Sequence, residues 1–111
     1  MSQIVFFGID LGTTNTKVIA VKESGEFIAS ARRATEWIVL PNGRIEADAN
    51  LLYKKVVDCI NELVTTTTGI VGQFKVAGLG ITGMAERGVI LDKDNTLFPY
   101  TTLFRSRKSV V

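Results

Sequence analysis

Short hydrophobic runs separated by turn residues mark the first third of the chain. Residues 4–9 form a continuous apolar run rich in β-formers, which is typical of a central strand covered on both faces. A turn-forming stretch at residues 10–15 follows, and residues 17–22 and 26–33 read as two more strands around a turn at 23–25. Because both connections are short, the three strands are predicted to form an antiparallel meander.

One amphipathic helix is predicted in the middle of the chain, after a loop at residues 34–47 that shows no clean period. Asp48 is the predicted N-cap, because its carboxylate can accept a backbone N–H of the first turn. The helix should end before residues 65–69, where four threonines and a glycine disfavour continuation and suggest a solvated loop. Apolar residues recur on one helical face at Leu52, Val56, Cys59, Ile60 and Leu63.

Two further strands are predicted after the helix, at residues 75–81 and 88–91, with a turn at 92–95. The helix then acts as a crossover that returns the fourth strand parallel to the first. The predicted fold class is α/β, a mixed sheet in the order βββαββ with a helix covering at least one face.

Composition and charge exclude several classes of protein. The chain has 111 residues, of which 46% are hydrophobic and 22% charged, which suits one small folded domain. Residues 100–111 hold three bases and no acid, whereas the rest carries ten bases and eleven acids, so the body lacks the basic stripe of a nucleic-acid-binding protein. No basic leader or membrane-length apolar run occurs, and a cytoplasmic protein without nucleic-acid or membrane partners is expected.

The chemistry available to the chain is narrowed by two residue counts. Histidine is absent, which removes the commonest base at neutral pH. Cys59 is the single cysteine, so neither an internal disulfide nor a cysteine metal cluster is possible, and its place on the apolar helix face favours a core role.

The turn after the first predicted strand has the composition of a phosphate-binding loop. Glycine allows a tight turn and a close approach to an anion, while hydroxyl, amide and main-chain groups donate hydrogen bonds to phosphate oxygens. A carboxylate at the end of a buried strand is suited to Mg²⁺, and a lysine adds positive charge. The same residue types also serve ordinary hairpin turns. The candidate residues are Asp10, Gly12, Thr13, Thr14, Asn15 and Lys17 for the cofactor, with Asp10 also the candidate metal ligand.

Two other nucleotide-binding motifs are not supported. The chain has no G-x-x-x-x-G-K-[ST] sequence, which excludes a Walker-type loop. Gly78, Gly80 and Gly83 satisfy G-x-G-x-x-G, but a dinucleotide site requires this motif to open a helix. The β-rich residues 88–91 that follow argue against such a helix.

The ten residues from Gly8 to Lys17 closely resemble the first phosphate motif of the actin-like ATPase superfamily, which includes sugar kinases, Hsp70 chaperones and actin. Residues 43–48, the helix and residues 76–92 together resemble the FGGY carbohydrate kinases, over about residues 4–99. This resemblance implies an RNase H-like (actin-like ATPase) fold, here an incomplete N-terminal domain. It also implies ATP and Mg²⁺ as cofactors and transfer of the ATP γ-phosphate to a hydroxyl of a small sugar or polyol.

The resemblance places substrate-binding residues at Met84, Ala85 and Glu86. Glu86 matches a position that binds substrate hydroxyls, and a carboxylate is a suitable acceptor for them. Met84 replaces the usual Gln, and Ala85 replaces a substrate-binding Arg of glycerol kinases, which argues against glycerol. Trp37 either lines the sugar site or has a core or loop-anchoring role. The catalytic Asp of the family is expected beyond residue 111, so the chain alone is expected to be inactive.

Residues 1–99 are interpreted as the partial kinase domain, and residues 100–111 as an atypical basic tail that lacks the family's Trp-x-Asp-x-Arg segment and is a candidate for non-native sequence. Homo-oligomerisation stays open. A non-catalytic phosphate- or nucleotide-binding module is the alternative function, and an Hsp70-like chaperone module is a more distant one.

Overall fold

In the described residues, the strands and the helix follow one another as the hydrophobic pattern predicts, and three short strands are added to them. The computed structural model describes residues 2–83 and 103–105. The predicted fifth strand at residues 88–91 and the turn at 92–95 lie outside this part. The elements are β1 (Gln3–Leu11), β2 (Asn15–Lys22), β3 (Phe27–Ala34), β4 (Ile38–Val39), β5 (Ile45–Ala47), α1 (Ala49–Val71), β6 (Phe74–Gly83) and β7 (Leu103–Arg105).

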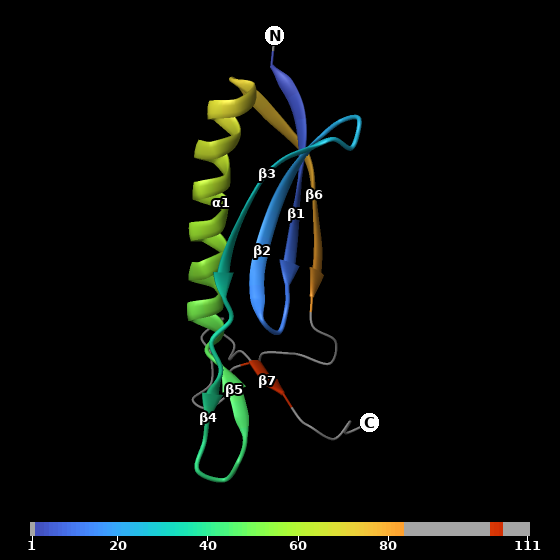
Figure 1. The fold of residues 1–111 in the computed structure, drawn as a ribbon. Coiled ribbons are helices and arrows are strands. Elements are labelled where there is room, and N and C mark those ends of the chain that lie inside the picture. The colour runs from blue at the N-terminus through green and yellow to red at the C-terminus, as the bar shows by residue number, and fades with distance from the viewer. Residues whose placement is uncertain (1, 84–102, 106–111) are drawn as a thin grey trace, which may run out of the picture.

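The main sheet has the strand order β3-β2-β1-β6 (Figure 1). Strands β1, β2 and β3 pair antiparallel, which confirms the predicted meander. Strand β6 pairs parallel to β1, which confirms the helical crossover. The predicted turn at residues 10–15 is shorter than expected, because Asp10 and Leu11 still pair with β2 and belong to β1.

The hydrophobic core lies between the sheet and α1, which runs along one face (Figure 1). Cys59 and Leu63 of α1 are fully buried against alternate residues of β1 and β2, such as Val5 and Val18. Val56 and Ile60 pack against the same cluster, and Leu52 is buried, so the predicted apolar helix face is confirmed. Burial also raises the pKa of the Cys59 thiol, which suits the core role predicted for it.

Asp48 caps α1 as predicted. Its Oδ1 accepts hydrogen bonds from the backbone N–H groups of Asn50, at 2.9 Å, and Leu51, at 3.3 Å. These two donors belong to the first helical turn and have no partner inside the helix, so the cap stabilises the helix start.

The prediction that the helix ends before residue 65 is wrong, because α1 continues to Val71. Thr67 lies four residues after Leu63 and is also fully buried, so it extends the packed face by one turn. The hydroxyls of Thr65 and Thr68 donate to the carbonyls of Asn61 and Val64 four residues earlier, which satisfies them within the helix. Packing against the sheet thus outweighs the low helix propensity of this segment.

Replacing Gly69 with alanine should stabilise the chain, because Gly69 sits inside the helix and an added Cβ meets no atom within 4 Å. The free energy of unfolding should rise by about 0.5–1 kcal/mol in urea titrations followed by circular dichroism. Gly72→Ala is the matched control and should destabilise, since Gly72 ends the helix at φ 77°. A loss of stability in Gly69→Ala would contradict this placement of the helix end.

The predicted loop at residues 34–47 is also corrected, because it contains the antiparallel pair β4 and β5. The backbone N–H of Leu40 donates to the carbonyl of Arg44 at 2.8 Å, and Gly43 takes a left-handed φ of 85° in the turn. Strands of two and three residues are too short for their alternation to show in the sequence. Strand β5 pairs with β7, which lies in the segment interpreted as an atypical tail.

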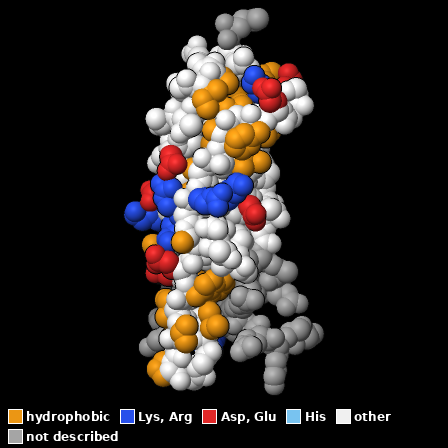
Figure 2. Space-filling model, viewed as in Figure 1, with side chains coloured by type: hydrophobic (Ala, Val, Ile, Leu, Met, Phe, Trp, Pro, Cys, Tyr) orange, Lys and Arg blue, Asp and Glu red, His pale blue; other side chains and the backbone are white. Residues whose placement is uncertain are grey.

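The sheet face opposite α1 is not covered by any helix of the described residues. Near the N-terminal end of β1 it exposes hydrophobic side chains, including Phe6 and Phe27, whereas the other end carries polar ones. Figure 2 shows hydrophobic side chains gathered towards both ends of one view of the molecule, with charged side chains between them. Among the described helices, none is long and apolar enough to span a membrane.

Candidate phosphate-binding site

The turn between β1 and β2 is closed by one short hydrogen bond. The backbone N–H of Gly12 donates to the carbonyl of Asn15 at 2.9 Å. A Cβ on Gly12 would lie 2.8 Å from that same carbonyl oxygen, closer than real contacts allow. Gly12 is therefore required by the close approach of the backbone to Asn15, whereas its φ is not among the positive values.

The carbonyls of Gly12, Thr13 and Thr14 each accept a hydrogen bond from the segment that follows β3. The Gly12 carbonyl accepts from the Thr35 hydroxyl at 2.9 Å, and the Thr14 carbonyl accepts from the Thr35 backbone N–H at 2.9 Å. The Thr13 carbonyl accepts from Trp37 Nε1 at 2.8 Å. Of the two roles considered for Trp37, the structure therefore shows contact with this loop.

These bonds leave the amides of the turn available. In the part of the chain that the structure describes, no acceptor contacts the backbone N–H of Thr13 or Thr14, and both residues are exposed. Successive free N–H groups beside hydroxyl side chains form a concave donor set that suits phosphate oxygens.

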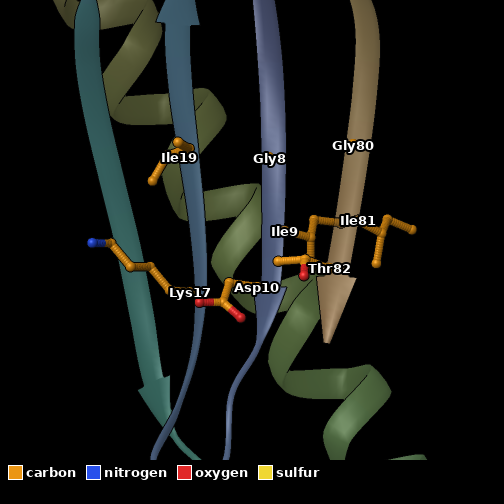
Figure 3. Close-up of a pocket in the computed structure, with 8 residues that line it drawn as sticks. All are labelled: Gly8, Ile9, Asp10, Lys17, Ile19, Gly80, Ile81 and Thr82. Carbon is orange, nitrogen blue, oxygen red and sulfur yellow. The ribbon is translucent and has the colours of Figure 1, made fainter. Parts of the chain in front are cut away.

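A row of polar residues crosses all four strands of the main sheet beside this turn. In the strand register, Asp10 on β1 lies directly opposite Lys17 on β2 and Thr82 on β6. Lys17 in turn lies opposite Arg32 on β3. Strand neighbours in register project from the same face, which here is the one opposite α1. Figure 3 shows Asp10 between Lys17 and Thr82, each on its own strand, with α1 behind the sheet.

Two cations face each other in this row. Lys17 and Arg32 lie directly opposite each other on neighbouring strands, and two like charges in such positions destabilise the sheet. Neither forms an ion pair within the described residues, so both charges are available to an anion. The hollow they share with the turn has a volume of about 310 Å³ and is lined by Asp10, Gly12, Thr13, Thr14, Asn15, Lys17 and Arg32. The structure thus brings together all six cofactor-site candidates and adds an arginine.

A second hollow of about 450 Å³ adjoins the first at Asp10 and Lys17 (Figure 3). Its floor contains the paired glycines Gly8 and Gly80, which leave the neighbouring strands without side chains at that point. An added Cβ on Gly80 would meet no atom within 4 Å, so it would enter open space. Ile19 and Ile81 also line this hollow, which is consequently more apolar than the first.

Within the described residues, Asp10 is the one carboxylate that the site offers to a metal ion. No cluster of three His, Cys, Asp or Glu residues occurs among the residues described, which argues against a metal cage built by these residues alone. Magnesium that binds with phosphates commonly uses one or two carboxylates together with phosphate oxygens. Asp10, next to the free amides of the turn, fits that mode.

Three predicted site residues lie beyond the part of the chain described, and three further site residues were not predicted. Met84, Ala85 and Glu86 lie outside the described residues. Arg32, Thr35 and Thr82 were missed because each comes from a different strand or connection than the turn itself. The G-x-G-x-x-G residues lie within β6, which confirms that this motif does not open a helix.

A mixed sheet with an antiparallel β1–β2–β3 meander, a crossover helix and a parallel β6 is the beginning of the actin-like ATPase fold found in sugar kinases. The family model described as the FGGY family of carbohydrate kinases, N-terminal domain, matches residues 5–110. The chain belongs to the FGGY family of carbohydrate kinases.

Known relatives agree with this assignment. Over 94 residues the chain is 32% identical to a glycerol kinase of Oceanobacillus iheyensis, covering 85% of this chain and 18% of that protein. Gluconate kinase of Lactobacillus acidophilus superposes with a TM-score of 0.80 at 25% identity, covering 93% of this chain and 20% of that one. Xylulose kinase of Rhodospirillum rubrum gives 0.80 at 26% identity, covering 90% and 20%. The chain thus spans about a fifth of the length of these relatives.

Proposed function

We propose that this chain supplies the phosphate-binding part of an ATP-dependent carbohydrate kinase, which transfers the ATP γ-phosphate to a hydroxyl of a sugar or polyol. The observation that carries the proposal is the turn with free Thr13 and Thr14 amides beside the unpaired cations Lys17 and Arg32. Phosphoryl transfer depends mainly on positioning and on neutralising charge, and this set of groups suits both tasks.

Each residue has a proposed role. The Thr13 and Thr14 amides and the Asn15 side chain hold phosphate oxygens, and Lys17 and Arg32 attract the polyphosphate. Asp10 holds Mg²⁺, which when bound neutralises phosphate charge. We further propose that Glu86, with Met84 and Ala85, contacts the sugar hydroxyls, and that residues 1–99 form the kinase part of the chain.

Catalysis needs a group that takes the proton from the sugar hydroxyl, and among the described residues the two hollows are lined by no acid other than Asp10 and by no histidine. We propose that the base is supplied by sequence outside these 111 residues, so the chain alone binds phosphate but transfers none. The same observation favours the second candidate, a phosphate-binding module without catalysis. An assay of sugar phosphorylation by a longer protein that contains this chain distinguishes the two candidates, because only the kinase predicts activity.

Binding of ADP to the chain tests the proposed site. Trp37 is the single tryptophan and contacts the turn, so its fluorescence should change as ADP and Mg²⁺ are added. In Lys17→Gln the dissociation constant should rise about three- to tenfold, because one cation is lost. Lys75→Gln is the matched control, since Lys75 pairs with Ile4 at the far end of the sheet. Equal affinities for both variants would overturn the proposal.

A further inference from the structure

We propose that residues 35–37, which we call the strap, act as a positioning element that aims the amides of the β1–β2 turn at phosphate. Thr35 and Trp37 are then positioning residues that act through the turn. This inference rests on the proposed phosphate site and adds residues that lie more than 20 positions away from it in the sequence.

Donors of the strap bind three successive carbonyls of the turn. Thr35 holds the carbonyls of Gly12 and Thr14, and Trp37 holds that of Thr13, at 2.8–2.9 Å. A peptide unit carries its carbonyl and its N–H on opposite sides because it is planar and trans. Fixing these carbonyls on the strap side therefore directs the N–H groups of the following residues, Thr13, Thr14 and Asn15, away from the strap.

The strap is itself fixed to the helix. Lys55 of α1 donates to the Ala34 carbonyl at 2.6 Å and pairs with the Glu36 carboxylate at 3.1 Å. Its side chain is only 15% exposed, so this contact is partly shielded from water. The turn, the strap and α1 thus form one connected unit, in which a helix of 23 residues supports the turn.

An anion site benefits from this support because a flexible turn can rotate a peptide and present a carbonyl to the phosphate. A carbonyl oxygen repels phosphate, whereas an N–H attracts it. Donors that are fixed before the ligand arrives need no ordering on binding, so affinity rises. The alternative is that the strap only stabilises the fold, in which case its loss would lower stability and leave phosphate affinity unchanged.

Substitutions at Thr35 separate these roles in the chain of residues 1–111, with pyrophosphate as the probe. Thr35→Val removes the hydroxyl donor at nearly constant volume, and Thr35→Ser keeps it. The Thr35→Val variant should bind pyrophosphate about fivefold more weakly, while Thr35→Ser should bind as the parent does. Thr66→Val is the matched control on the exposed side of α1 and should leave affinity unchanged.

Nuclear magnetic resonance measures both the affinity for pyrophosphate and the hydrogen bond to the Gly12 carbonyl in one experiment. Titration gives the dissociation constant from the Thr13 and Thr14 amide shifts, and the Gly12 carbonyl carbon shift reports its hydrogen bond. That carbon shift should change in Thr35→Val and return in Thr35→Ser. Trp37→Phe, which keeps an aromatic ring and loses the Nε1 donor, should weaken binding by about fivefold as well and covers the case in which Thr35→Val does not fold.

The possible outcomes distinguish failure of the strap inference from failure of the proposed phosphate site. Absence of pyrophosphate binding by the parent chain would overturn the proposed phosphate site, and with it the inference. Binding by the parent together with unchanged affinity in folded Thr35→Val or Trp37→Phe would overturn the strap inference alone.

Discussion

Gly12→Ala should abolish most phosphate binding by the chain, with pyrophosphate affinity falling about tenfold or more. The new Cβ would lie 2.8 Å from the Asn15 carbonyl oxygen, and that oxygen is held in place by the Gly12 N–H itself. The turn must open to relieve the clash, which moves the Thr13 and Thr14 amides together. Losing two donors to a charged ligand accounts for an effect of this size.

The same substitution should lower the free energy of unfolding by about 1–3 kcal/mol, because the crowded atom belongs to the backbone and cannot rotate away. Calorimetric titration with pyrophosphate and urea unfolding measure the two effects separately. Gly69→Ala is the matched control for affinity, since its Cβ meets no atom within 4 Å and Gly69 lies on α1, away from both hollows. Gly12→Ala with parental affinity would show that the turn does not hold phosphate.

Asp10→Asn should change pyrophosphate affinity in opposite directions with and without magnesium. Without Mg²⁺, the Asp10 carboxylate repels the anion that Lys17 attracts, so its neutralisation should tighten binding about threefold at low salt. With saturating Mg²⁺, the variant loses the proposed metal ligand, and binding should weaken about tenfold.

Calorimetric titrations of pyrophosphate in the presence and absence of Mg²⁺ give this comparison directly. Asp58→Asn is a suitable control, because Asp58 pairs with Lys54 on α1, away from both hollows. A decrease of similar size under both conditions would indicate that Asp10 supports the turn structurally. An unchanged affinity with Mg²⁺ would exclude it as the metal ligand.

The position of Arg32 illustrates how the site depends on strand register. The turn at residues 23–25 brings Lys22 opposite Glu26, and regular pairing from there would place Ala31 opposite Lys17. A register shift between Ala20 and Val21 instead places Arg32 there and turns Ala31 into the core. One extra residue reverses the faces of a whole strand, and burial of Ala31 in place of a charged arginine favours this register.

The sequence by itself determined the features that depend on neighbouring residues. The apolar run of β1, the turn chemistry around Gly12, the Asp48 cap and the apolar face of α1 all follow from spacing and residue type. Such features are governed by local backbone geometry and by which side of an element is apolar, and a single segment carries that information.

Only the tertiary structure decided where distant segments meet. Burial of Thr67 against the sheet extended α1 past its predicted end, and the register shift brought Arg32 beside Lys17. Folding also placed Thr35 and Trp37 behind the turn, where their donors bind its carbonyls. The contacts of Thr35 and Trp37 join residues more than 20 positions apart. All of these contacts form because packing and hydrogen-bond satisfaction across the fold outweigh local preference.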